Sequence, residues 1–232
     1  MEYSLPRAVV SSMTETSGSE FAYHDGVRAN EGSEENGVRR RQLAVVSAGL
    51  STPSSTRLLA NRLAADAVAE LAERDIDASI QTFELRDVAH DVTDRLLTGR
   101  VTPALEELFA ALNSADGLIA VTPIFSTSYS GLFKSFIDVL DPNALNGTPV
   151  LLGANAGSAR HSLAVDYAMR PLFTYLHASP LPTGVFAASG DWDAQGEAVA
   201  PLADRIRRGA RELAEAVAAR PARVFQPADV RR

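Results

Sequence analysis

The chain has 232 residues, of which 46% are apolar and 22% charged, and its formal net charge is −7. This acidic balance argues against general nucleic-acid binding, which needs a basic face to displace counterions from phosphates. The sequence has no cysteine, which excludes disulfides, Cys-ligated metals and thiol nucleophiles. No apolar run reaches the ~18 residues of a membrane span. Because the N-terminus lacks the apolar stretch of a signal peptide, we expect a cytoplasmic protein.

The first 41 residues differ in composition from the rest of the chain. They hold seven acidic and five basic residues among many Ser, Gly and Asn. Such a segment cannot bury enough apolar surface to offset its ordering entropy, so residues 1–41 are predicted to be a disordered extension. We interpret the arginines 39–41 as a solvated boundary, with an anion-binding patch as the alternative. One domain is expected over 42–220, followed by a tail over 221–232.

Beyond residue 41, short apolar runs alternate with stretches long enough for helices. The expected strands are 42–48, 78–85, 116–123, 148–153 and 183–189, and the expected helices are 54–73, 102–113, 129–140, 161–178 and 197–219. Thr102 followed by Pro103 is typical of a helix start, and Pro171 is expected to bend the helix that contains it.

The alternation of strands and helices predicts the fold class. Five strands separated by helices indicate βαβ units and a parallel sheet. The strands are continuous apolar runs, which is typical of a sheet covered on both faces. The sequence therefore predicts an α/β three-layer sandwich with a five-stranded parallel sheet. Ligands of such sheets bind outside the carboxyl ends of the strands, so the loops that follow the strands are the candidate sites.

The first candidate loop leaves strand 42–48 and opens the next helix. Residues 47–57, SAGLSTPSSTR, contain a dense set of hydroxyls. A helix N-terminus offers free backbone N–H groups and the positive end of the dipole, so added hydroxyls make a cradle for phosphate. The loop matches neither the dinucleotide fingerprint nor the P-loop of NTPases. Ordinary N-capping is the alternative, but it needs a single Ser or Thr.

The second candidate loop, residues 122–131, follows the third strand. It is rich in small and hydroxyl residues, and Phe125 and Tyr129 lie outside the apolar periodicity. Such a loop can hold a flat ring against backbone groups. The equally consistent alternative is that Tyr129 begins the next helix and packs on its neighbour.

The third candidate loop, residues 153–161, follows the fourth strand and reads GANAGSARH. Its glycines let the backbone approach a ligand closely. Arg160 and His161 at a helix start are unfavourable with the helix dipole, which suggests an anionic ligand or a polar ring. The equally consistent alternative is that both side chains merely reach water. The histidines have no metal-ligand spacing, so no metal site is expected.

Three segments carry a resemblance to a known family. They are VVSAGLSTPSSTRLLA, ADGLIAVTPIFSTSYSGLFKSFIDVLD and GANAGSARHSLAVDYAMRPLFTYLHA. Together they resemble the NADPH-dependent FMN reductase family of the flavodoxin-like fold, and most closely the reductases that supply reduced flavin to two-component monooxygenases. The likeness spans about residues 42–192. It implies the strand order 2-1-3-4-5 with FMN at the carboxyl edge of the sheet.

The resemblance gives each loop a role in binding FMN. The first loop would hold the phosphate, the second would flank the isoalloxazine ring, and the third would face the polar edge of the ring. The implied cofactor-binding residues are Ser47, Ser54, Ser55, Thr56, Pro123, Ile124, Phe125, Ser126, Tyr129, Ser130, Gly157, Ser158 and His161. Many relatives carry an arginine within the phosphate loop, whereas this loop reads Ala-Gly-Leu-Ser and Arg57 comes later.

The resemblance also implies NADPH or NADH as the reductant, a flavin-dependent monooxygenase as a partner, and a homodimer or homotetramer. Hydride transfer is the chemistry of the cofactors, so the protein needs only to stack and orient the two rings. No classical catalytic residue is therefore expected. A hydroxyl cradle holds phosphate less tightly than an arginine clamp, which favours exchange of FMN. Phe173, Tyr175 and Leu176 would supply either a subunit contact or part of the core.

Two alternative functions on the same fold stay open. One is an FMN-containing quinone, azo or metal-ion reductase, and the other is a non-enzymatic flavodoxin-like electron carrier. A phosphoacceptor receiver module is rejected because residues 121–123 read Val-Thr-Pro where an aspartate is required. A hydrolase is rejected because no G-x-S-x-G motif is present.

Overall fold

The computed structural model describes residues 39–221. The predicted extension 1–41 and tail 221–232 therefore lie almost entirely outside the described residues. Within the described part, the strands are β1 (Arg39–Ser47), β2 (Ile76–Glu84), β3 (Gly117–Phe125), β4 (Ser128–Tyr129), β5 (Pro149–Ala156), β6 (Ser179–Pro180) and β7 (Val185–Ala188).

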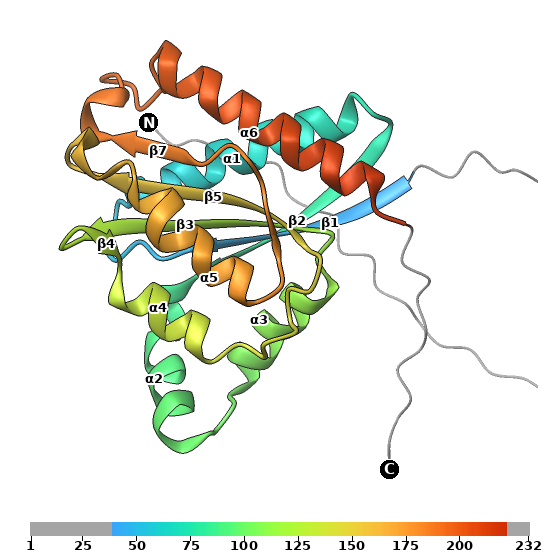
Figure 1. Cartoon of the computed structure of the whole chain (residues 1–232), viewed down its shortest axis with the longest axis vertical. Helices are drawn as coiled ribbons and strands as arrows, with labels where there is room; N and C mark the ends of the chain where they lie inside the picture. The colour runs from blue at the N-terminus through green and yellow to red at the C-terminus, as the bar shows by residue number, and fades with distance from the viewer. Residues whose placement is uncertain (1–38, 222–232) are drawn as a thin grey trace, which may run out of the picture. The chain divides into compact units, whose positions relative to one another are not determined.

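These strands form one sheet in the described part of the chain, with the order β2-β1-β3-β5-β6. β7 also pairs with β5 in parallel, and β4 pairs antiparallel with β3. The five strands predicted from the sequence correspond to β1, β2, β3, β5 and β7, and all their pairings are parallel. The predicted order 2-1-3-4-5 is confirmed, with the two-residue strands β4 and β6 added (Figure 1).

Helices cover both faces of the sheet. They are α1 (Ser55–Ala72), α2 (Ala89–Thr98), α3 (Pro103–Ser114), α4 (Gly131–Asp138), α5 (Arg170–Tyr175) and α6 (Ala200–Ala219). Three start at hydroxyl caps: the Oγ of Ser54, Thr102 or Ser130 accepts a backbone N–H of the first turn of α1, α3 or α4. A cap of this kind stabilises a helix by about 1 kcal/mol.

The core has two halves, one on each face of the sheet. α1 and α6 cover one face, where Leu59 and Leu213 pack against Val45 of β1. α3, α4 and α5 cover the other face, where Phe133 and Phe173 are fully buried. Successive side chains of the inner strands β1, β3 and β5 enter opposite halves, which is why their buried parts are continuous apolar runs rather than alternating ones, whereas the edge strand β2 is largely exposed or half-buried. The predicted three-layer sandwich is confirmed (Figure 1).

Three local expectations need correction. β1 begins at Arg39, three residues before the apolar run, and Arg41 is buried rather than solvated because it pairs with Asp116. The expected helix 161–178 is divided into a 3₁₀ turn, the π-helix Val165–Met169 and α5. The change from π to α lies just before Pro171, whose missing N–H removes one helical hydrogen bond. Helix α2 was not predicted at all.

Candidate functional site

The three candidate loops meet at the carboxyl edge of the sheet, where they form one cleft. Its volume is about 330 Å³. It is lined by Leu50, Ser51, Ser55, Thr56, Pro123, Ile124, Phe125, Asn155, Ala156, Gly157 and Ser189. Segments that are far apart in sequence thus supply one site, because parallel strands end at the same edge.

The first loop wraps closely around the start of α1. Ser54 caps this helix, since its Oγ accepts the backbone N–H of Arg57 at 3.1 Å. A Cβ on Gly49 would lie 2.0 Å from this same Oγ, so a side chain there would displace the Ser54 cap. The first turn of α1 contains no acidic residue. No carboxylate in this turn therefore competes with an anionic ligand for its N–H groups and hydroxyls.

Asn155 fastens this helix start to the sheet. The Thr56 Oγ1 donates to the Asn155 Oδ1 at 2.7 Å, and the Asn155 Nδ2 donates to the Ser55 Oγ at 2.8 Å. Thr56 is only 2% exposed and Asn155 9% exposed. Sequence reasoning did not assign Asn155 to the site. The available signal was an amide side chain at the end of an otherwise apolar strand.

The second loop has one part that lines the cleft and one part that packs against the start of α4. Pro123, Ile124 and Phe125 line the cleft, and the Phe125 side chain is half exposed. Tyr129 packs on Phe133 with a ring-centroid distance of 6.1 Å, which supports the packing alternative for this residue. The Ser130 hydroxyl is buried and accepts the Phe133 N–H at 3.2 Å, so it caps α4.

The turn between β3 and β4 directs the exposed end of the second loop. Ser126 and Thr127 both adopt positive φ values, 47° and 74°. This left-handed geometry is uncommon for residues other than glycine and clusters at functional sites. Ser126 is exposed at the tip of the turn and is not among the residues that line the cleft.

The third loop contributes less of the cleft than expected. Gly157 lines it, and no atom lies within 4 Å of a Cβ built there, so this wall is open. Ser158 accepts the Arg160 N–H at 3.4 Å and thereby caps a 3₁₀ turn. Arg160 is exposed and His161 half-buried, and neither is among the lining residues.

The predicted cofactor-binding residues therefore fall into two groups, those that line the cleft and those that do not. Those that line it are Ser55, Thr56, Pro123, Ile124, Phe125 and Gly157. Those beside or behind it are Ser47, Ser54, Ser126, Tyr129, Ser130, Ser158 and His161. Ser47 ends β1, and its Oγ is fully buried with no hydrogen-bond partner among the described residues.

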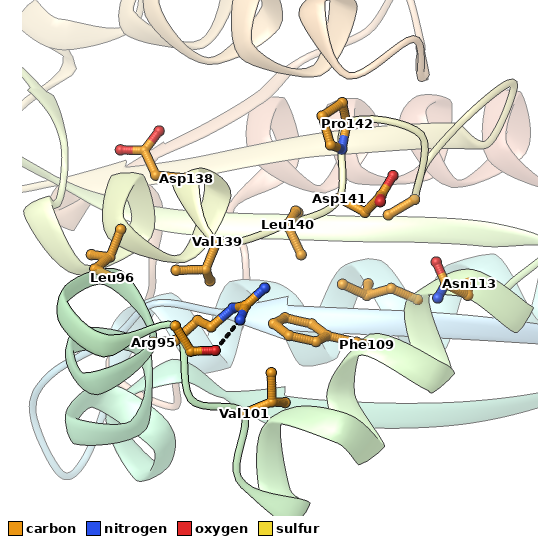
Figure 2. Close-up of a pocket in the computed structure, with 13 residues that line it drawn as sticks. Arg95, Leu96, Val101, Phe109, Asn113, Asp138, Val139, Leu140, Asp141 and Pro142 are labelled. Atoms are coloured by element: carbon orange, nitrogen blue, oxygen red, sulfur yellow. Dashed lines mark hydrogen bonds between the residues drawn. The ribbon is translucent and has the colours of Figure 1, made fainter.

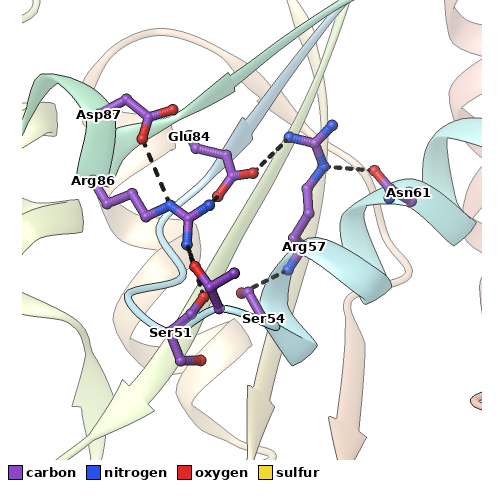
Figure 3. A network of polar contacts seen from close by, with 8 residues as sticks. Ser51, Ser54, Arg57, Asn61, Glu84, Arg86 and Asp87 are labelled. Carbon is purple, nitrogen blue, oxygen red and sulfur yellow. Dashed lines mark hydrogen bonds and ion pairs between the residues drawn. The ribbon is translucent and has the colours of Figure 1, made fainter.

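A network of charged side chains lies on the outer side of the first loop (Figure 3). Glu84, at the end of β2, pairs with Arg57 at 3.1 Å and with Arg86 at 2.9 Å. Arg57 also donates to the Asn61 Oδ1 at 2.7 Å, and Arg86 donates to the Ser51 carbonyl at 2.9 Å. The sequence offered no signal for Arg86, because it lies outside the three candidate loops.

The donor set of the cleft fits a phosphorylated aromatic ligand. The N-terminus of α1 and its hydroxyls suit a phosphate, and the buried Ser47 Oγ next to this loop retains an unused hydrogen-bonding group. Pro123, Ile124 and the half-exposed Phe125 supply an apolar wall for a ring. Among residues 39–221, no cluster of His, Asp and Glu could hold a metal ion. The residues present thus match FMN in both its anionic and its aromatic part.

A second pocket lies away from this cleft (Figure 2). It has a volume of about 570 Å³ and is formed by α2, α3 and the end of α4, with Phe109 and Leu140 among its lining residues. These segments lead into β3 and β5, so the pocket lies toward the amino ends of the strands. It shares no residue with the three candidate loops.

The parallel sheet, its strand order and its two helical layers are those of a flavodoxin-like protein. Residues 42–193 match the family model for NADPH-dependent FMN reductase, so the chain belongs to this family. It is an NAD(P)H:FMN oxidoreductase, with FMN and a nicotinamide nucleotide as its redox pair. The resemblance noted for residues 42–192 is thereby confirmed.

Individual relatives agree with this assignment. The chain is 36% identical to an FMN reductase (NADPH) of Pseudomonas aeruginosa, covering 75% of this chain and 90% of the relative. It is also 36% identical to the NADH-dependent FMN reductase SfnE of Pseudomonas putida, covering 72% and 88%. The crystal structure of an oxidoreductase from Corynebacterium diphtheriae is 45% identical, covers 79% of this chain and 100% of that one, and superposes with a TM-score of 0.75.

None of the helices within residues 39–221 combines the length and the apolar character that crossing a bilayer requires.

Proposed function

We propose that this reductase binds FMN in the cleft formed by its three loops and delivers reduced FMN to a separate flavin-dependent monooxygenase. The observation that carries the proposal is the convergence of the loops: the hydroxyl-lined start of α1, the apolar wall of Pro123 to Phe125, and Gly157 line one cleft. The remaining lining residues carry no charge; they are Leu50, Ser51, Asn155, Ala156 and Ser189.

The phosphate of FMN is assigned to the start of α1. Ser54 and Ser55 accept hydrogen bonds there and keep their hydroxyl hydrogens for the phosphate, Thr56 donates its hydroxyl hydrogen to Asn155, and Ser47 ends β1 just before this loop. Ser55 and Thr56 keep fixed directions because both bond to Asn155. The positive end of the helix dipole supplies the field that favours a phosphate.

The isoalloxazine ring is assigned to the wall formed by Pro123, Ile124 and Phe125, with Ser126, Tyr129 and Ser130 in the same loop. Gly157, Ser158 and His161 are assigned to its polar edge. When bound, FMN supplies the acceptor for the hydride of the nicotinamide. The residues of this chain orient the ring, shield one side from water and leave the other side open, so that the nicotinamide can stack there. No side chain is assigned to acid or base catalysis.

The cradle favours exchange of FMN rather than permanent binding. Its direct donors are hydroxyls and backbone N–H groups, and the guanidinium groups beside the first loop, those of Arg57 and Arg86, are already paired with Glu84. A phosphate held without a free arginine clamp is bound less strongly. This arrangement suits an enzyme that must release reduced FMN to a partner.

Steady-state oxidation of NADPH and NADH with FMN, FAD and riboflavin tests the proposal, together with stopped-flow measurement of FMN release. We expect turnover with free FMN and release at least as fast as turnover. Release slower than turnover would contradict delivery to a partner. Turnover with quinones, azo dyes or metal ions but not with free FMN would favour the reductase alternative, and absence of nicotinamide oxidation would favour an electron carrier.

We propose that the reductase is a homodimer or homotetramer assembled through the segment after β5. Leu163, Tyr167 and Tyr175 of this segment are 64%, 78% and 76% exposed, whereas Phe173 and Leu176 are buried in the core. Exposed aromatic side chains in one stretch are typical of an interface. We expect Tyr167→Glu to lower the mass measured by light scattering, while the control Leu97→Glu, at an exposed residue of α2, leaves it unchanged. A monomeric parent protein would contradict the proposal.

The proposed location is the cytoplasm. It is supported by the reductant, because NADPH and NADH are produced and recycled there. Fractionation of cells that express the chain, with activity followed in each fraction, tests this location.

A further inference from the structure

We propose that Arg86 is a positioning residue that makes the reductase select phosphorylated flavin. It would act by holding the first loop in the shape that the phosphate needs, without itself contacting the phosphate. The inference rests on the proposed phosphate position at the start of α1. It gives a function to the network of Glu84, Arg57 and Arg86, which the hydride transfer itself does not need.

Arg86 donates hydrogen bonds to two neighbouring residues of the first loop. Its Nη1 donates to the Ser51 carbonyl at 2.9 Å and also to the Thr52 Oγ1 (Figure 3). Ser51 lines the FMN cleft, whereas Thr52 is on its outer side. The guanidinium group therefore holds the loop from behind, and the inner side of the loop stays free for the ligand.

Glu84 fixes the guanidinium group in turn. Its carboxylate is largely buried, with 15% of the side chain exposed, and its Oε2 pairs with the Arg86 Nη2 at 2.9 Å. The Oε1 of the same carboxylate pairs with Arg57, in the first turn of α1, at 3.1 Å. One carboxylate at the end of β2 thus connects both sides of the cradle, the loop through Arg86 and the helix start through Arg57.

The charges explain why Arg86 positions the loop rather than binding the phosphate itself. Glu84 and Asp87 both pair with Arg86, the latter at 3.6 Å, so its positive charge is already balanced. Its Nη1 is committed to the loop. Binding sites act through donors held within about 0.5 Å of the productive geometry by supporting contacts. Loss of Arg86 should therefore weaken only those interactions that depend on the shape of the loop.

Riboflavin provides the decisive comparison because it has the ring of FMN but no phosphate. We expect Arg86→Gln to raise the dissociation constant for FMN about tenfold, on the scale of one lost charge-assisted hydrogen bond, and to change that for riboflavin less than about twofold. Quenching of flavin fluorescence on binding measures both constants. At saturating FMN, kcat should equal that of the parent, so the change appears in KM.

Three further variants complete the experiment. Arg207→Gln, at an exposed arginine of α6 that pairs with Asp204, is the matched control and should leave both flavin constants unchanged. Thr52→Val removes only an acceptor on the loop, and it tests the proposal even if Arg86→Gln folds poorly; it should weaken FMN selectively, though less. Adding Glu84→Gln to Arg86→Gln also removes the partner of Arg57, so the double variant should bind FMN more weakly than Arg86→Gln does, with riboflavin binding again changed less than about twofold.

Other outcomes would overturn the inference. Equal weakening of FMN and riboflavin, or an unchanged constant for FMN, would show that Arg86 has no phosphate-specific role. A changed ratio of NADPH to NADH turnover with unchanged FMN binding would assign the network to the nicotinamide nucleotide instead. A parent protein that binds FMN and riboflavin equally would refute the phosphate position itself, whereas a parent that prefers FMN and a variant that keeps this preference would refute only the role of Arg86.

Discussion

Replacement of Asn155 by Leu is expected to raise the dissociation constant for FMN about 30-fold. Asn155 accepts from Thr56 and donates to Ser55, so Leu removes two hydrogen bonds. A typical hydrogen bond contributes about 1 kcal/mol, and 1.4 kcal/mol corresponds to a factor of ten in affinity. Both hydroxyls would then be free to seek other partners, and the start of α1 would lose its fixed position against β5.

Flavin titration and thermal melting together check this expectation. The exposed Asn146 offers a control, since Asn146→Leu should leave FMN binding unchanged. Asn155→Asp is informative as a second variant, because it keeps an acceptor for Thr56 but replaces the donor to Ser55 with a negative charge near the phosphate. We expect it to bind FMN more weakly than Asn155→Leu does. Unchanged affinity in both variants would refute the assignment of the phosphate to this helix start.

The sequence predicted the fold because the relevant signals are local. Continuous apolar runs mark β1, β3 and β5, and a hydroxyl residue ahead of each apolar stripe marks the start of α1, α3 and α4. Once a parallel sheet is inferred, the position of the cleft follows, because loops after parallel strands share one edge. The sequence pattern alone therefore predicts that the three loops lie at one edge of the sheet.

The individual contacts could not be predicted because they join distant residues. Asn155 and Thr56 are 99 positions apart, and nothing in either neighbourhood specifies the other. Arg86 reaches the first loop from the turn after β2, and the course of that turn depends on the packing of α2, which lacks a hydroxyl cap. The same holds for Ser130, which the resemblance places near the flavin ring: its burial and its hydrogen bond to the Phe133 N–H at the start of α4 depend on how α4 packs against β3.

Asp116 also makes a contact with a residue distant in sequence, which the sequence could not predict. We expect loss of its side chain to lower the stability of the fold strongly. Its Oδ1 pairs with the Arg41 Nη1 at 3.2 Å, and its Oδ2 accepts the Gln42 N–H at 2.9 Å. The side chains of Arg41 and Asp116 are 6% and 9% exposed. Arg41 also donates to the carbonyl of Arg220, which attaches the end of α6 to the sheet. Truncation of Asp116 would leave the buried guanidinium charge uncompensated.

We therefore expect Asp116→Ala to lower the free energy of unfolding by about 3–5 kcal/mol, the usual result of removing one partner of a buried ion pair. Urea unfolding measures this difference. Removing both charges, with Arg41→Met added, should recover part of the loss, because no unpaired charge then stays buried. FMN affinity of the folded fraction should not change, since the pair lies at the amino ends of β1 and β3, opposite the cleft. A loss below about 1 kcal/mol, in the range of exposed pairs, would show that water reaches Arg41 and that the pair does not hold α6 in place.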